Sequence, residues 1–390
     1  MDIATHRADI EAWLILLRAP QLSASRLREL IARHASAAHA LAAMRAGEAV
    51  EHAATRAWLR APDHDAIARD LDWLAGASHR LVTIDSADFP ALLRDAPGAP
   101  AALFVAGNAD ALWQPQIAIV GSRNASHGGL ANARSFARAL GAAGFAIASG
   151  LAEGIDAAAH EAALDAGAPT IAVLGTGPDL VYPLRHRGLA ARIAAPGALV
   201  SEFAPGMPGR PENFPRRNRI IAGLALGTLV VEAGLKSGSL ITARHAIEQG
   251  RDVFAIPGSI HNPVARGCHR LIRDGAMLVE SADEIIDALA PLAARLGAHL
   301  RDRLDAASTE ALRPAPVQRD GDYVRLLEAL GPDEALGIDV LAGRTGLPAA
   351  ALSSMLLVLE LEGEVAIERG GAYVRTQRSA IAPSRGGQQR

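Results

Sequence analysis

Three arginines are concentrated in residues 214–219 (FPRRNR), directly before an apolar run typical of a helix. Pro215 suits the first turn of that helix. Cations in this turn oppose the helix dipole, at a cost of roughly a few tenths of a kcal/mol each, so helix stability does not explain them. Two explanations remain open, namely a bound anion or ion pairs to Glu202 or Glu212.

Three turns rich in Gly and Ser follow short apolar runs: 121–123 (GSR), 149–150 (SG) and 236–238 (KSG). Glycine lets a backbone approach a ligand closely, and the helix N-terminus that follows such a turn offers free N–H groups to a phosphate. Arg123 adds a guanidinium to the first turn. The turns therefore indicate phosphate contacts, although a tight turn with a surface arginine is an equally ordinary interpretation of the first one.

The third turn contains Lys236, the single lysine of the chain. Lys236 and Ser237 resemble the end of a Walker A loop. Leu235, however, occupies the position of the required glycine, so the sequence does not support ATP binding by that route.

Catalytic constellations are weak in this sequence. Asp156 and His160 have helical i, i+4 spacing and could form an acid–base pair, but such a pair more often stabilises a helix. No nucleophile, base and orienting group form a recognisable set, and Cys268 has no obvious low-pKa setting. A dinucleotide fold needs GxGxxG and a following acid, yet no Asp or Glu occurs between Asn124 and Ala152. We expect no cofactor.

The composition limits the class of protein further. The formal net charge is −3 with 21% charged residues, so a polyanion site must be a local patch on a globular protein. One cysteine excludes an internal disulfide and a CxxC zinc site, and the histidines lack metal-ligand spacing. The N-terminal residues lack the pattern of a signal peptide. The longest uncharged apolar run, between Arg219 and Glu232, is too short to cross a bilayer. We therefore expect a cytoplasmic protein without a membrane partner.

The central part of the chain alternates between apolar runs and helix-length amphipathic segments. The expected strands are 117–120, 145–148, 170–174, 199–201, 228–231, 253–256 and 277–279. Continuous apolar strands separated by helices predict a parallel sheet that is covered on both faces. Right-handed crossovers place every turn after a strand at one edge of that sheet, where open α/β sheets bind ligands.

The sequence predicts five segments. Residues 1–76 read as a helical domain, 77–290 as an α/β domain with a row of phosphate-type loops, and 291–318 as a linker rich in Ala, Pro and Arg. Residues 319–376 have the pattern of three helices closed by a β-hairpin, which is typical of a winged helix. We expect a disordered tail at 377–390.

At these residues the chain resembles the family of DNA-processing proteins called DprA or Smf. The resemblance spans about residues 80–290, and its motifs follow one another in order, which is more specific than a single glycine-rich loop. The motifs are GSR at 121–123, SGL at 149–151, GID at 154–156 with His160, GTG at 175–177 with YP at 182–183, SE at 201–202, FP at 214–215, RNRIIAG at 217–223, EA at 232–233, SGSL at 237–240, TA at 242–243, PG at 257–258 and residues 267–275.

The resemblance implies an extended Rossmann-like α/β fold with a mostly parallel sheet, an N-terminal SAM-like helical domain and a C-terminal winged helix. It further implies a non-enzymatic homodimer that binds single-stranded DNA, protects incoming DNA during natural transformation and loads a RecA recombinase for homologous recombination. The residues that would contact DNA by this resemblance are Gly121, Ser122, Arg123, Ser149, Gly150, Phe214, Arg217, Asn218, Arg219, Lys236, Ser237 and Gly238.

Two alternatives belong to other classes. One is a nucleotide-hydrolysing enzyme related to the phosphoribohydrolases, with Asp156 and Glu232 as catalytic carboxylates. It is weakened by the absence of a second glycine before Thr176. The other is a duplex-DNA regulator acting through the winged helix, whose expected recognition helix at 348–362 contains no Lys or Arg.

Overall fold

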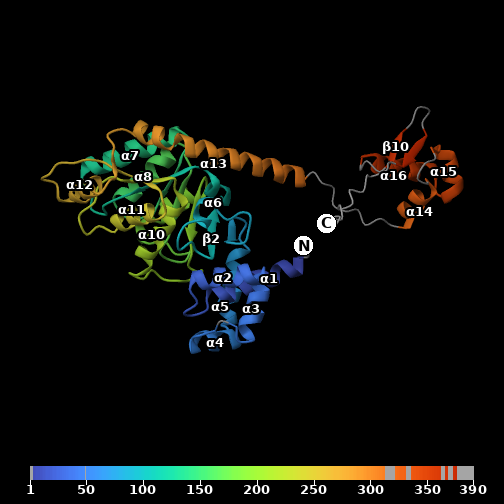
Figure 1. Ribbon diagram of the computed structural model, residues 1–390, viewed down its shortest axis with the longest axis horizontal. Coiled ribbons are helices and arrows are strands. Elements are labelled where there is room, and N and C mark those ends of the chain that lie inside the picture. The colour runs from blue at the N-terminus through green and yellow to red at the C-terminus, as the bar shows by residue number, and fades with distance from the viewer. Residues whose placement is uncertain are drawn as a thin grey trace, which may run out of the picture. The chain divides into compact units, whose positions relative to one another are not determined.

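The computed structural model describes residues 3–48, 50–311, 321–330, 335–361, 365–367 and 372–375. The chain divides into two compact units, Met1–Asp305 and Ala306–Arg390. The larger unit contains an N-terminal group of helices and an α/β domain, and the smaller unit is a separate helical module (Figure 1).

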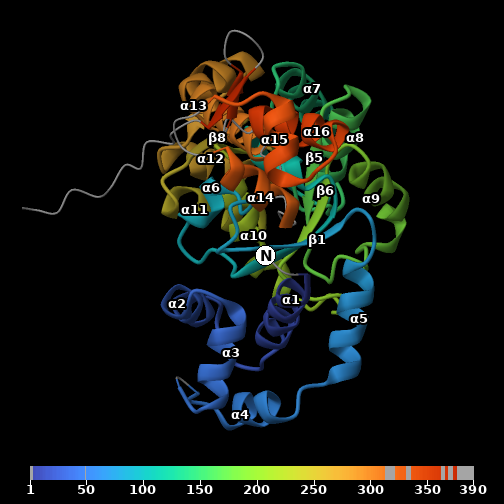
Figure 2. The ribbon, with the colours of Figure 1, turned by 90° about the vertical axis from the view of Figure 1, so that its right-hand side faces the viewer.

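Five helices begin the larger unit: α1 (Ile3–Leu17), α2 (Ala24–His34), α3 (Ala37–Arg45), α4 (Ala53–Arg60) and α5 (His64–Leu74). Ser23, Ser36 and Asp63 cap three of them by accepting backbone N–H bonds, as N-cap residues do. Trp13 and Phe104 belong to one buried cluster, which joins these helices to the first strands of the sheet. The helical domain and the sheet therefore share a core (Figure 2).

A nine-stranded sheet forms the centre of the larger unit. Its strands are β1 (His79–Thr83), β2 (Ala102–Gly107), β3 (Gln116–Val120), β4 (Ala146–Ser149), β5 (Thr170–Val173), β6 (Ala198–Ser201), β7 (Gly227–Val230), β8 (Asp252–Ala255) and β9 (Met277–Leu278). Their order is β1-β2-β6-β5-β4-β3-β7-β8-β9. The strands from β3 to β9 pair in parallel, whereas β2 pairs antiparallel with both β1 and β6. The predicted fold class, a mostly parallel Rossmann-like sheet, is confirmed.

Helices cover both faces of this sheet, as the unbroken apolar strands require. One face packs against α6 (Ala91–Arg94), α10 (Asn213–Leu224), α11 (Ser239–Glu248) and α12 (Arg266–Arg273). The other packs against α7 (His127–Ala142), α8 (Ile155–Asp165), α9 (Arg187–Ala194) and the start of α13 (Ala282–Ala311). Short 3₁₀ turns occur at Ala109–Trp113, Leu184–His186 and Pro263–Ala265.

The segment that we expected to be a linker, residues 291–318, is helical over much of its length. Helix α13 continues to Ala311 and contains Pro291 in its interior. The composition rich in Ala, Pro and Arg suggested a linker, but Ala and Arg are also strong helix formers, and their preference outweighs the one proline inside the helix. Residues 312–318 lie outside the described part of the chain.

The smaller unit contains α14 (Gly321–Ala329), α15 (Ile338–Thr345), α16 (Ala349–Leu361), β10 (Val365–Ile367) and β11 (Tyr373–Arg375). The two strands pair antiparallel, and Leu326, Leu341 and Leu356 are fully buried among its helices. The predicted winged helix is confirmed. The predicted tail, residues 377–390, lies outside the described residues.

None of the helices within the described residues combines the length and the apolar character that crossing a bilayer requires. The same residues contain no cluster of three or more His, Cys, Asp or Glu side chains arranged to hold a metal ion.

Candidate nucleic-acid interface

The strand order reverses between β3 and β7. Strands β4, β5 and β6 extend from β3 on one side, whereas β8 and β9 extend from β7 on the other. Open α/β sheets bind ligands at such a reversal, outside the carboxyl ends of the strands. A cavity of about 710 Å³ lies there, bordered by residues 120–124, by residues 234–239 and by the first turns of α10.

The cavity brings together most of the predicted site residues. Those that line it are Gly121, Ser122, Arg123, Phe214, Arg217, Asn218, Lys236, Ser237 and Gly238. Gly150 borders a smaller neighbouring recess with Tyr182 and Phe214. Ser149 and Arg219 line neither space.

The turn after β3 is fixed by its backbone. The N–H of Ser122 donates to the carbonyl of Glu232 at 2.7 Å, and the carbonyl of Ser122 accepts from Ile155 at 3.2 Å. A Cβ on Gly121 would lie only 2.6 Å from the Ile155 side chain, so this position requires glycine. Arg123 is exposed, and it makes no ion pair with any residue the structure describes. The turn therefore presents a free guanidinium on a rigid support.

Glu232, at the end of β7, holds the first turn of α7 in place. Its carboxylate accepts from the backbone N–H of Ser126 at 2.8 Å, from the Ser126 hydroxyl at 2.6 Å and from the Asn262 amide at 3.2 Å. Gly129 packs so closely that a Cβ there would lie 2.4 Å from the Glu232 carboxyl carbon. The buried carboxylate is fully engaged, which leaves it poorly placed for catalysis.

The turn after β7 presents the single lysine. Ser237 closes the turn through its N–H to Gly234 at 2.9 Å, and its hydroxyl lies 2.8 Å from that of Ser239. The Ser237 hydroxyl also accepts from the N–H of Ser239 at 3.3 Å, at the first turn of α11. Lys236 is exposed, without an ion pair among the described residues. The turn thus places an ammonium beside the N-terminus of a helix, a combination that suits a phosphate.

Arg217 is buried below the cavity with 4% of its surface exposed. Its Nη1 donates to the carbonyl of Gly150 at 2.7 Å and also to the carbonyl of Val173. Burial lowers the pKa of Arg217 to about 10, an effect that Asp156 opposes and Arg123 reinforces. The guanidinium therefore stays charged at neutral pH. It joins α10 to the ends of β4 and β5 rather than projecting into solvent.

Asp156 is the buried counter-charge in this part of the site. Its Oδ2 accepts from the N–H of Gly150 at 3.1 Å and from that of Ala152 at 3.4 Å. Burial raises the pKa of Asp156, while Arg217 and these backbone N–H groups lower it. Ser149 is equally internal, since its hydroxyl donates to Ile119 at 2.6 Å. Asp156 and Ser149 therefore build the loop after β4 and do not reach the cavity as free groups.

Arg219 does not occupy the position that the sequence suggested. Its Nη2 pairs with Glu202 at 2.6 Å, and Arg216 approaches the same carboxylate at 3.2 Å. Residues three apart share a helix face, and this face of α10 points to Glu202 after β6. The ion-pair explanation thus holds for Arg216 and Arg219. Arg217 turns toward the cavity instead.

An aromatic pair borders the cations. Phe214 and Tyr182 have ring centroids 5.4 Å apart, and the Arg123 guanidinium carbon lies 5.8 Å from the Phe214 centroid. Tyr182 is 54% exposed. We did not predict Tyr182 as a site residue, because it lies on a different loop from Phe214. Only its position in the YP motif after GTG could have suggested it. Below, we call Tyr182 and Phe214 the aromatic platform.

The other catalytic candidates are internal as well. His160 Nδ1 lies 2.7 Å from the Thr170 hydroxyl, and burial lowers the pKa of His160 to about 3, so the ring is neutral. Burial raises the pKa of Cys268 to about 12, which leaves it a thiol. Neither group offers acid–base or nucleophilic chemistry to the cavity.

A glycine-rich, cationic cavity at the strand reversal is where Rossmann-like sheets hold the phosphates of their ligands, and the fold places this chain among the extended Rossmann-type proteins. Residues 80–290 match the family described as DNA recombination-mediator protein A, and residues 310–371 match the DprA winged helix domain. The chain belongs to the DprA, or Smf, family of DNA-processing proteins.

Individual relatives agree with this assignment. Protein Smf of Escherichia coli K12 is 45% identical over 314 residues, covering 80% of this chain and 82% of that protein. DNA processing protein DprA of Streptococcus pneumoniae is 47% identical over 198 residues, covering 51% and 70%. The X-ray structure of DprA from Streptococcus pneumoniae has a TM-score of 0.65 at 35% identity, covering 71% of this chain and 97% of that chain.

The role of Glu232 can be tested by the substitution Glu232→Gln. An amide places an NH₂ group against one of the donors that now face a carboxylate oxygen, so we expect a loss of about 1–3 kcal/mol in the free energy of unfolding. Chemical denaturation measures this loss. The matched change Glu212→Gln, at an exposed position, should alter stability by less than about 0.5 kcal/mol. Equal stability of the two variants would contradict the assignment.

Proposed function

We propose that this protein binds single-stranded DNA in the cavity at the carboxyl ends of β3 and β7. The observation that carries the proposal is the combination of cations without ion pairs and two aromatic rings, the exposed Tyr182 and the half-buried Phe214, around one open cavity. Arg123 and Lys236 supply the charge, and the aromatic platform supplies two π-faces. Among the described residues, Asp156 is the one acid that lines the cavity, and it is buried and engaged by backbone N–H groups.

A strand with several phosphates fits this arrangement better than one mononucleotide. Cationic turns lie on both sides of the reversal, after β3 and after β7, and the recess with the aromatic platform lies beside them. Stacking on an aromatic ring requires an unpaired base and contributes about 1–3 kcal/mol per base. A duplex keeps its bases stacked on one another, so the platform favours single strands.

The relatives support DNA as the polymer. The Streptococcus pneumoniae relative is named a DNA processing protein, and the matching family is described as a DNA recombination mediator. Within the cavity we assign phosphate contacts to Gly121, Ser122, Arg123, Lys236, Ser237 and Gly238. Phe214 stacks on a base together with Tyr182. Arg217 and Asn218 shape the cavity, to which Arg217 contributes charge and Asn218 an amide. Gly150 borders the recess, and Ser149 supports the loop after β4. Because Arg219 pairs with Glu202, we assign it no DNA contact.

A binding function without catalysis is the better interpretation of the carboxylates. The phosphoribohydrolase-like alternative needs Asp156 and Glu232 as free groups. Both are buried. Asp156 accepts hydrogen bonds from the backbone of its own loop, and Glu232 accepts them from Ser126 and Asn262. We therefore propose no reaction for this cavity.

Removal of the two exposed cations tests the proposal. The double variant Arg123→Ala/Lys236→Ala should raise the Kd for a single-stranded oligonucleotide by on the order of tenfold or more. It should also make the slope of log K against log salt shallower by about 1.4, since each phosphate contact to a single strand contributes about 0.7. Fluorescence anisotropy over a salt series measures both quantities.

The matched control removes the same charge elsewhere. Arg138 and Arg192 are exposed on α7 and α9, away from the cavity. Arg138→Ala/Arg192→Ala should keep the wild-type Kd within about twofold and the wild-type slope. An unchanged Kd in the Arg123→Ala/Lys236→Ala variant, or a salt-independent Kd in the wild type, would refute the proposed site.

The family resemblance extends the proposal to a recombinase of the RecA class. A protein that holds single strands in an open cavity can present them to the recombinase while competing with single-stranded-DNA-binding protein. We expect substoichiometric amounts of this protein to shorten the lag of recombinase ATPase on DNA coated with that competitor. The Arg123→Ala/Lys236→Ala variant should not shorten it. Equal stimulation by this variant would mean that recombinase loading does not depend on the cavity.

The resemblance also implies a homodimer, for which the free edge of the sheet is the candidate interface. Among the residues that the structure describes, β9 pairs with β8 alone, and Met277 and Leu278 are 44% and 42% exposed. Apolar side chains on an unpaired edge strand suit association with a second copy. Leu278→Asp should convert the protein to a monomer in sedimentation velocity experiments. The comparable change Ile247→Asp on exposed α11 should leave the dimer intact, and the reverse result would place the interface on α11.

A further inference from the structure

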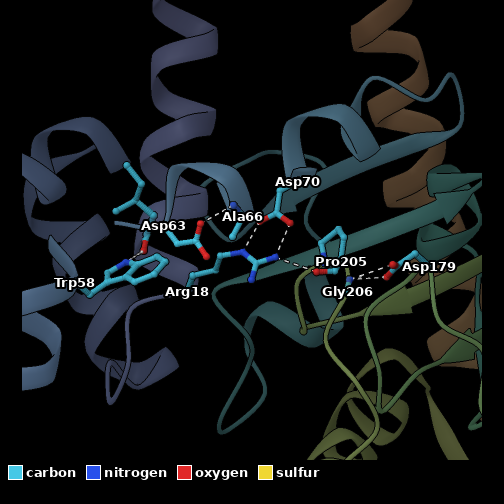
Figure 3. Close-up of polar contacts among 9 residues, drawn as sticks. Arg18, Trp58, Asp63, Ala66, Asp70, Asp179, Pro205 and Gly206 are labelled. Carbon is cyan, nitrogen blue, oxygen red and sulfur yellow. Dashed lines mark hydrogen bonds and ion pairs between the residues drawn. The ribbon is translucent and has the colours of Figure 1, made fainter. Parts of the chain in front are cut away.

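An arginine of the N-terminal helical domain binds both its own domain and the α/β domain. Arg18, directly after α1, uses Nε and Nη2 to hold the two carboxylate oxygens of Asp70, each at 2.6 Å. The same Nη2 donates to the carbonyl of Pro205 at 2.9 Å. Figure 3 shows this guanidinium between Asp70 on α5 and the loop that contains Pro205.

The contact is buried and depends on the shape of the guanidinium. The Asp70 side chain is fully buried, and Arg18 is 18% exposed. Burial raises the pKa of Asp70, which Arg18 opposes. A buried carboxylate that loses its cation is strongly destabilised, so Arg18 is constrained to this geometry. A lysine ammonium cannot reproduce the planar fork and the third bond together.

Pro205 lies in the loop after β6, which is bound at several points to the loop after β5. Ala204 packs in the core of the helical domain. The N–H of Gly206 donates to both oxygens of Asp179 at 2.9 and 3.0 Å, and Met207 accepts from Gly177 at 2.8 Å. The loops after β5 and β6 thus form one linked structure (Figure 3).

These two loops carry the aromatic platform. The loop after β5 continues from Asp179 to Tyr182, and the loop after β6 continues from Gly206 to Phe214 at the start of α10. The Asn213 amide ties the second loop back to Gly175 at 3.1 Å. A shift of the Pro205 segment would therefore change the separation of the two rings.

We propose that the N-terminal helical domain positions the aromatic platform for DNA, with Arg18 as a positioning residue that acts through Pro205, Gly206 and Asp179. The inference rests on the proposed function, because it concerns the same cavity. Arg18 itself lines neither the cavity nor the recess, so its effect on DNA passes through the two loops.

Two variants interrupt this link at different points. Arg18→Lys keeps the charge but loses the fork. Asp179→Ala breaks the bond to Gly206 at an exposed position, where loss of folding is not expected. The control is Arg33→Lys, whose exposed ion pair with Glu48 at 2.6 Å lies within the helical domain alone. The probe is a single-stranded oligonucleotide that contains 2-aminopurine, whose fluorescence falls when the base stacks.

We expect Arg18→Lys and Asp179→Ala each to raise the Kd about three- to tenfold and to reduce the 2-aminopurine quenching, with the salt slope unchanged. The direction in which Asp179→Ala changes the Kd separates positioning from a simple effect of charge. Loss of a carboxylate near a DNA site should by itself strengthen binding of a polyanion, so weaker binding identifies positioning. In the background of Phe214→Ala, neither substitution should have a further effect, because the platform is already lost. Arg33→Lys should behave as wild type.

Several outcomes would overturn this inference. One is a Kd and quenching equal to wild type in Arg18→Lys with only the unfolding temperature lowered, which would mean a purely structural role. A tighter Kd in Asp179→Ala is another, and full additivity with Phe214→Ala is a third. Failure of the proposed function is distinguishable, because the wild type itself would then not bind the oligonucleotide or would bind without quenching.

Discussion

A buried guanidinium holds the carboxyl ends of the central strands together. The Arg217 side chain binds the carbonyls of Gly150 and Val173 at the ends of β4 and β5, and Asp156 supplies the opposing charge nearby. Removing a charge from water costs several kcal/mol unless hydrogen bonds and a counter-charge offset the loss. This one side chain therefore joins α10 to the loop after β4 and to the end of β5.

The cations of the site consequently divide into two groups. Arg217 is committed to the protein, and its charge acts from below the cavity. Arg123 and Lys236 stand on turns whose backbone bonds are already satisfied, so their charge is available to a ligand. Because the protein's own hydrogen bonds hold Arg217 and both turns, ligand binding requires little reordering of the loops.

Local sequence determined much of this fold, whereas tertiary contacts decided the rest. Apolar runs bounded by Gly and Ser turns predicted the strands and the edge at which their loops meet, because a parallel topology allows few arrangements. For the arginine cluster, the sequence left open both a bound anion and an ion pair to Glu202. Only the tertiary contacts of α10 separate Arg219, which pairs with Glu202, from Arg217, which binds loop carbonyls. Tyr182 was missed because its contact with Phe214 joins two loops.

The position of the single lysine has a practical chemical consequence. Apart from the amino terminus, Lys236 carries the only primary amine of the polypeptide, and it is exposed beside the cavity. An acylating reagent directed at amines therefore reacts at one side chain. Protection of that amine reports occupancy of the cavity directly, and a dye attached there serves as a local sensor.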